Sequence, residues 1–171
     1  HGKFRRQRQM CIRDRLTIES GLRQIEDTWR SQRFEVIKYF KGPQERGLVL
    51  RTTEEIQQTL EDQMMNLSSM MSSRYVTPFL ETTGRWEKLM STISEVIEVW
   101  MKVQSKWMYL EAIFIGSEDI RLQLPEEAKR FDRIHGTFKK TMTETQKDPN
   151  VLSACTADGR FDQLTGLFAQ L

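Results

Sequence analysis

One long amphipathic segment, residues 79–115, constrains the fold of this chain more than any other feature. Large apolar residues recur in it at every seventh position, and a second row lies three residues further on. The first row is Phe79, Trp86, Ile93, Trp100, Trp107 and Phe114, and the second is Leu89, Val96, Val103 and Leu110. Two rows at this spacing form one continuous seam on an α-helix. An unbroken helix here would span roughly 55 Å, which is typical of a mechanical or scaffolding element.

Shorter patterned segments surround this helix. Residues 17–32 and 56–71 have helical apolar spacing, the second with Thr52 as its candidate cap. Residues 34–40 and 48–50 indicate a β-hairpin with a loop of about seven residues. Pro125 and the two acids after it begin a helix whose predicted apolar face is Ala128, Phe131, Ile134, Phe138 and Met142. A last helix is predicted with Phe161, Leu164, Leu167, Phe168 and Leu171 on one face. The predicted fold is mainly α, an elongated helical-bundle rod with one small β-hairpin.

The basic residues are concentrated at the N-terminus. The formal net charge is +2, but residues 1–15 hold six basic residues and one acid, and the remainder has 20 basic and 23 acidic residues. Residues 10–15, MCIRDR, are similar to translated sequencing-adapter sequence. We therefore expect 1–15 to be a non-native or disordered basic tail, and residues 16–171 to hold the domain. A nucleic-acid binder that uses the tail arginines is an alternative, which weakens if the tail is foreign.

No motif for catalysis or cofactor binding is present in the sequence. It has no GxxxxGK[ST] phosphate loop, no GxGxxG turn, no HExxH and no GxSxG. Asp132 and His135 have a spacing that metal-binding bundles use, but the further ligands such a site needs are missing, so a solvated pair is favoured. Cys11 and Cys155 form no ligand cluster. We predict no catalytic, cofactor or metal site in these residues, and no run of roughly 18 apolar residues could span a bilayer.

Three stretches resemble one protein family. VQSKWMYLEAIFIGSEDIRLQLPEEAKRF (103–131) resembles the linker signature of dynein heavy chains, and residues 25–63 and 132–155 resemble the segments on either side. WMYLEAIFIG and YFKGPQERG are most similar to axonemal inner-arm heavy chains. The resemblance covers residues 16–171. The residues to which it assigns the linker signature and its packing are Trp86, Trp100, Trp107, Tyr109, Leu110, Phe114, Pro125 and Phe131.

The resemblance implies a mechanical function. In this family the linker is a curved, mainly helical rod across a ring of six AAA+ modules, and ATP hydrolysis in the ring drives its swing toward the microtubule minus end. The chain would then be part of the lever of a ciliary or flagellar motor, located in the cytoskeleton of the axoneme. Its expected partners are the AAA+ ring of the same heavy chain, the remaining linker helices, other dynein chains and microtubules, with neither nucleic acid nor membrane.

Two departures from the family pattern limit what the resemblance implies. The ring, stalk and microtubule-binding domain are absent, so ATP and Mg would belong to the parent motor ring, and we expect no cofactor and no enzyme activity in these residues. Residues 1–15 also stand where the family has an upstream tail that binds intermediate and light chains. Independently of the resemblance, the last apolar face runs to Leu171 without a stop signal, so we expect a fragment truncated at its C-terminal end. A free-standing helical scaffold that binds partner proteins through the Trp100/Trp107 seam is the alternative function.

Overall fold

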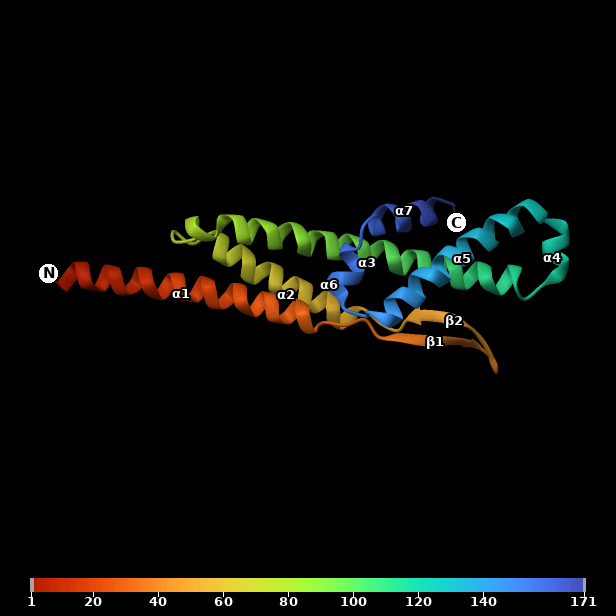
Figure 1. The fold of residues 1–171 in the computed structure, drawn as a ribbon, viewed down its shortest axis with the longest axis horizontal. Coiled ribbons are helices and arrows are strands. Elements are labelled where there is room, and N and C mark those ends of the chain that lie inside the picture. The colour runs from red at the N-terminus through yellow and green to blue at the C-terminus, as the bar shows by residue number, and fades with distance from the viewer. Residues whose placement is uncertain (1, 171) are drawn as a thin grey trace. The chain divides into compact units, whose positions relative to one another are not determined.

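The computed structural model describes the backbone of residues 2–170 and the side chains of residues 12, 13 and 15–170. Within these residues it has seven α-helices, one short 3-10 helix and one two-stranded antiparallel sheet (Figure 1). The predicted mainly-α fold with one small hairpin is confirmed. The elements are α1 Gly2–Ser31, β1 Val36–Lys41, β2 Gln44–Leu50, α2 Glu54–Met71, the 3-10 helix Thr77–Phe79, α3 Leu80–Phe114, α4 Glu118–Gln123, α5 Pro125–Lys147, α6 Val151–Thr156 and α7 Arg160–Gln170.

The chain divides into two compact units. The first consists of His1–Gln32 and Glu54–Thr92, and the second of Arg33–Thr53 and Ile93–Leu171. In the first unit α1 packs on α2, and an added Cβ on Gly21 would meet the end of the Met70 side chain. The buried apolar side chains of this unit come at helical spacing from α1, α2 and the first part of α3, and include Ile18, Leu22, Ile25, Trp29, Ile56, Leu60, Leu67, Trp86 and Met90.

The first helix is longer than the sequence predicted. It begins at Gly2 and ends at Ser31, whereas the apolar spacing predicted residues 17–32. The additional residues are 2–16, nearly all of them in the stretch 1–15 that we expected to be a tail. The side chains of residues 1–11 and Asp14 lie outside the described residues. That these residues are non-native stays a prediction.

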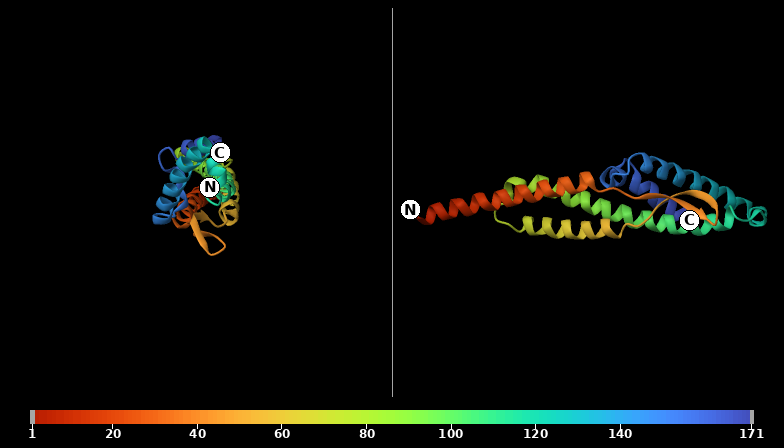
Figure 2. Two further views of the ribbon diagram at one scale, coloured as in Figure 1. Left: turned by 90° about the vertical axis from the view of Figure 1, so that its right-hand side faces the viewer. Right: turned by 90° about the horizontal axis from the view of Figure 1, so that it is seen from below.

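The second unit contains the hairpin, the rest of α3, and α4 to α7. Its hairpin lies against α5 (Figures 1 and 2). The predicted apolar face of α5 is confirmed, since all five of its residues are buried. On α7, Leu164 and Leu167 are buried, Phe161 is exposed and Phe168 is half-buried, while Leu171 lies outside the described residues. The sequence reasoning missed α6, a single short helix capped by the Asn150 side chain, which accepts from the Ser153 N–H at 2.9 Å.

The predicted long helix is α3, and its seam is mostly buried. Seven of the ten seam residues are buried, namely Trp86, Ile93, Val96, Trp100, Val103, Trp107 and Phe114. Leu89 and Leu110 are half-buried. Phe79 lies in the 3-10 helix that precedes α3 and is half-buried. Among the described residues no helix combines the length and apolar character needed to cross a membrane.

The prediction of a seven-residue hairpin loop is wrong. The strands pair as far as Lys41 and Gln44, so only Gly42 and Pro43 form the turn. Gly42 has φ +64°, which suits the first central position of a type II′ turn. The register then shifts between Tyr39 and Phe40, which pair with Gly47 and Glu45. Arg46 is therefore the extra residue of a β-bulge, a feature that re-aims a side chain.

Gly47 is required at this bulge for two reasons. Its φ is +148°, a conformation that L residues with side chains rarely adopt, and an added Cβ would lie 3.4 Å from Cη2 of Trp107. We predict that Gly47→Ala lowers the free energy of unfolding by more than about 1 kcal/mol. Gly136→Ala in α5 is the matched control, because nothing lies within 4 Å of its added Cβ. It should raise stability by about 0.5–1 kcal/mol. Urea unfolding checks both, and equal effects would contradict this account.

Candidate functional site at the Trp107 junction

The residues assigned by the family resemblance lie in different environments. Trp86 is buried in the first unit, and the other seven lie in the second. Within the second unit the structure brings together Trp107, Phe114 and Phe131, which are buried at the contact of α3 with α5. Trp100 is buried against Phe34, with ring centroids 5.2 Å apart. Leu110 is half-buried, and Tyr109 and Pro125 are exposed.

The structure supports one candidate site, which we call the Trp107 junction. It joins the hairpin, α3 and α5 through ring contacts, one amide pair and one buried ion pair. Its residues are Tyr39, Arg46, Gly47 and Leu50 of the hairpin, Gln104, Trp107 and Glu111 of α3, and Phe131, His135 and Phe138 of α5. Gln104, Trp107 and Glu111 share one face of α3, since they lie three and four positions apart.

Trp107 is the centre of the junction. Its ring meets Tyr39 edge-on at 6.0 Å and Phe138 at 4.9 Å between centroids. Its indole Nε1 donates to Nδ1 of His135 at 3.0 Å, and the two ring planes are 6° apart. The indole N–H of a buried Trp needs an acceptor, and His135 supplies it here. The hydrogen bond makes this contact directional, which packing of apolar rings alone is not.

The hydrogen bond also fixes the protonation state of His135. Because Nδ1 accepts, it carries no hydrogen, and the ring is neutral with its proton on Nε2. Burial lowers the pKa of His135, and Lys139 lowers it further. Glu111 and Asp132 raise it, and Arg121 opposes them, without reversing the direction. The neutral imidazole is thus the form that the junction stabilises.

A side-chain amide joins α3 to the hairpin. Gln104 is buried, and its Oε1 accepts from the Leu50 N–H at 2.8 Å, while its Nε2 donates to the Leu50 carbonyl at 2.8 Å. Both backbone groups of Leu50 point away from β1, because the neighbouring ladder bond, from the Arg51 N–H to the Glu35 carbonyl, alternates with them along the strand. Gln104 therefore completes the outer edge of β2, which would otherwise present unpaired groups in a buried place.

A buried ion pair lies beside this amide pair. Arg46, at the bulge, places Nη1 3.2 Å from Oε1 of Glu111, whose side chain is completely buried. Neither carboxylate oxygen of Glu111 has a hydrogen bond in the structure, and neither does Nε of Arg46. Removing two charges from water is costly, and the attraction between them recovers the cost only with good geometry. The pair therefore constrains where the bulge lies more than it contributes to net stability.

Asp132 and His135 do not form the solvated pair that the sequence favoured, because each binds another group. Asp132 binds the guanidinium of Arg121 through both carboxylate oxygens, and this hydrogen-bonded pair lowers the pKa of Asp132. His135 is occupied by Trp107. No group of three or more His, Cys, Asp or Glu residues that could hold a metal ion occurs among the described residues. Burial raises the pKa of the Cys155 thiol to about 12, which opposes any role as a nucleophile.

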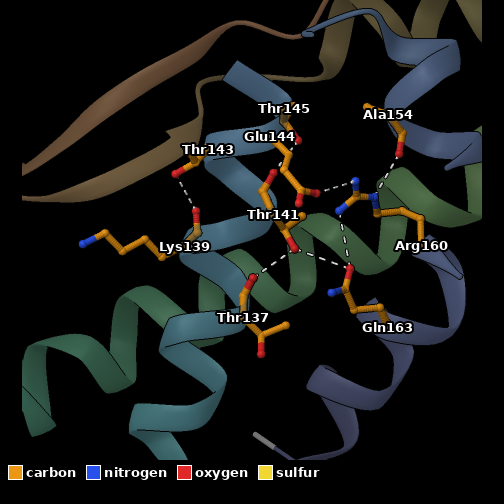
Figure 3. Close-up of polar contacts among 9 residues, drawn as sticks. All are labelled: Thr137, Lys139, Thr141, Thr143, Glu144, Thr145, Ala154, Arg160 and Gln163. Carbon is orange, nitrogen blue, oxygen red and sulfur yellow. Dashed lines mark hydrogen bonds and ion pairs between the residues drawn. The ribbon is translucent and has the colours of Figure 1, made fainter. Parts of the chain in front are cut away.

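A second polar cluster surrounds Arg160 (Figure 3). Its Nε donates to the Ala154 carbonyl at 3.1 Å, Nη1 to Oε1 of Gln163 at 3.4 Å, and Nη2 lies 3.8 Å from Glu144. The guanidinium also lies over the Trp100 ring, 5.6 Å from its centroid. This one side chain therefore connects α3, α5, α6 and α7.

The sequence reasoning missed the polar members of both clusters. Gln104 and Glu111 lie on the apolar face of α3, and a polar residue at such a position is a signal that a buried partner exists. That signal was available. Arg46 and Arg160 offer no comparable pattern, because each lies next to a turn where a charged residue is ordinarily solvated.

The family model and the similar proteins agree on one family. The model of the family "Dynein heavy chain, N-terminal region 2" matches residues 13–171. The dynein-1-alpha heavy chain of the flagellar inner arm I1 complex of Chlamydomonas reinhardtii is 58% identical over 156 residues, 91% of this chain. Dynein axonemal heavy chain 10 of Homo sapiens is 54% identical over 149 residues, 87% of this chain. The chain spans 3% of the length of each of these relatives.

The Arg46–Glu111 pair predicts strongly non-additive substitutions. Arg46→Met leaves an unpaired buried carboxylate, so it should cost about 3–5 kcal/mol, whereas Arg46→Met with Glu111→Leu should be near neutral or stabilising. Arg51→Met is the control, because it breaks an exposed pair with Glu35 and should cost about 1 kcal/mol or less. Urea unfolding of the wild type, of Arg46→Met, Glu111→Leu and Arg51→Met, and of the double variant measures this. A cost for Arg46→Met no larger than that for Arg51→Met would show that the buried pair is weak.

His135 predicts a pH dependence with a definite sign. A base whose pKa is lowered by folding gives its full stabilisation above its unfolded pKa of about 6.5. That stabilisation is lost as the pH falls from there toward the lower folded pKa, because the unfolded chain binds the proton more tightly. His135→Gln keeps an acceptor for Trp107 but does not titrate, so it should flatten this part of the profile. Unfolding free energies at about pH 7.5 and about pH 5.5 test this, and an unchanged slope in the variant would contradict it.

Proposed function

Since this chain belongs to the family of dynein heavy chains and lies in their N-terminal region 2, we propose that it is a section of the linker, the mechanical lever of an ATP-driven, minus-end-directed microtubule motor. The match over residues 13–171 is the observation that carries the proposal. The similar proteins are named as axonemal, ciliary and flagellar heavy chains, which supports a place in the axoneme of cilia or flagella, with an inner-arm type favoured.

The junction geometry fits a part that transmits force. A lever must move as a body, so its elements must not slide over one another. Apolar packing alone resists separation well but sliding poorly, because it has no direction. The Gln104–Leu50 amide pair and the Trp107–His135 hydrogen bond are directional and buried, so sliding the hairpin or α5 along α3 would break them.

Nucleotide chemistry and partners are assigned to the rest of the heavy chain. The sequence lacks a phosphate loop, so ATP and Mg would bind in the AAA+ ring of the parent motor. The proposed contacts of this section are that ring and the remaining linker helices, and the parent would assemble with other dynein chains and act on microtubules. The free-standing scaffold is not favoured, because Trp100 and Trp107 are 0% and 1% exposed and are not available to an outside partner.

A variant that slows movement along microtubules without slowing ATP hydrolysis tests the proposal. Gln104→Leu in the full-length heavy chain would orphan the N–H and C=O of Leu50, at about 1–3 kcal/mol for each group. We expect microtubule gliding to slow several-fold while ATP hydrolysis stays near the wild-type rate. Ser105→Ala, an exposed position next along α3, is the control. Unchanged gliding, or a parallel loss of both activities, would count against a lever at this site.

A further inference from the structure

The turn from α3 through α4 into α5 exposes large apolar side chains. We call residues 115–127 the α4 corner. Leu122 is 80% exposed, Leu124 45% and Ile115 38%. A single exposed apolar residue is ordinary on a protein surface, but here three lie within ten positions on one six-residue helix and its flanking turns. Such a concentration of apolar surface is typical of a contact with another polypeptide.

The corner is held rigidly although it is exposed. Arg121 of α4 donates through Nε to the carbonyl of Phe114, the last residue of α3, at 2.6 Å, and its two terminal nitrogens bind Asp132 of α5. Ser117 caps α4 by accepting from the Ile120 N–H. One guanidinium thus fixes α4 to the helices before and after it. A surface already fixed in its bound form loses little entropy when a partner binds.

Residues 115–127 carry a net negative charge, and the next bases along α5 are Lys129 and Arg130. Residues 115–127 contain four acids and one base, and the base is Arg121, which Asp132 neutralises. None of the four carboxylates is in an ion pair within the described part of the chain; they are Glu118, Asp119, Glu126 and Glu127. Acids suit the first turns of α4 and α5, but that role does not explain why apolar side chains lie exposed between them.

An apolar groove adjoins the corner. It lies between α3 and α5 and reaches Gln170 of α7, and its volume is about 180 Å³. Four apolar residues line it, Leu110, Phe114, Phe131 and Ile134, together with Glu127, Arg130 and Gln170. An apolar cavity of about 150 Å³ accommodates a molecule the size of benzene. The groove can therefore take one large apolar side chain, and Glu127 belongs to both the groove and the acidic surface of the corner.

We propose that the α4 corner and its groove form a docking surface for a basic segment of the same heavy chain, one that inserts a large apolar side chain flanked by Lys or Arg. The charges identify the chemistry of the partner, because unpaired carboxylates beside apolar surface match a cationic, apolar segment. That the segment belongs to the same heavy chain rests on the function proposed above. This chain spans 3% of the length of its relatives, and a segment tethered in the same polypeptide has a high effective concentration.

Photo-crosslinking in the purified full-length heavy chain tests this proposal. Leu122 is replaced by a photo-crosslinking amino acid, and the linked peptide is sequenced by mass spectrometry, both without nucleotide and with ATP and vanadate. We expect a peptide of the same heavy chain that carries a large apolar residue next to Lys or Arg. Lys140, exposed on α5, is the control position and should not give this peptide. Glu118→Lys with Asp119→Lys should reduce the crosslink several-fold, and so should about 1 M salt, which screens such charges.

Three results would overturn the proposal: no crosslink above the control position in either nucleotide state, a crosslink to another polypeptide, or a crosslink that charge reversal leaves unchanged. The double variant lies on the surface, and an unchanged limited-proteolysis pattern of this section shows that it is folded. These outcomes are independent of the Gln104→Leu experiment. Loss of the crosslink leaves the lever function intact, whereas unchanged gliding in Gln104→Leu would remove the lever without removing the contact.

Discussion

The second unit depends on the amide pair between Gln104 and Leu50. A two-stranded hairpin is marginal in water, so it needs a helix to hold it. Gln104 of α3 supplies both missing hydrogen bonds of Leu50. These two bonds fix the position of β2 along the axis of α3. With that position fixed, the bulge brings Arg46 to Glu111 and lays the backbone of Gly47 on the Trp107 ring.

Buried polar groups give this unit one arrangement out of many that apolar packing would allow. An apolar seam accepts shifts of register, but Gln104, Glu111 and the indole of Trp107 each need one partner, and each leaves a costly orphan without it. Arg160 does the same for α5, α6 and α7 by meeting the Ala154 carbonyl, Gln163 and Glu144 (Figure 3). Uniqueness of packing is what a part that passes force between its ends requires.

Helix α5 has two separate roles in this unit. Its apolar face, with Phe131 and Phe138, builds the core against α3, and its His135 accepts the hydrogen bond of Trp107. Its first turn and Asp132 instead support the α4 corner through Arg121. A contact made at the corner would therefore reach the Trp107 junction through a single rigid helix, which is a direct route from a docking surface to the hairpin.

The elements with a periodic apolar pattern could be predicted from the sequence. The heptad rows of α3, the five-residue face of α5 and the start at Pro125 are local patterns, so helix type and buried face could be read from them. The resemblance of residues 103–131 also led to the right family. The folded structure was needed for the two-residue turn and its bulge, the short helix α6, and the partners of Gln104, Arg46, Asp132 and Arg160. The turn and α6 are too short to show a period. The partners depend on which distant group lies opposite a side chain, and that information has no period along the chain.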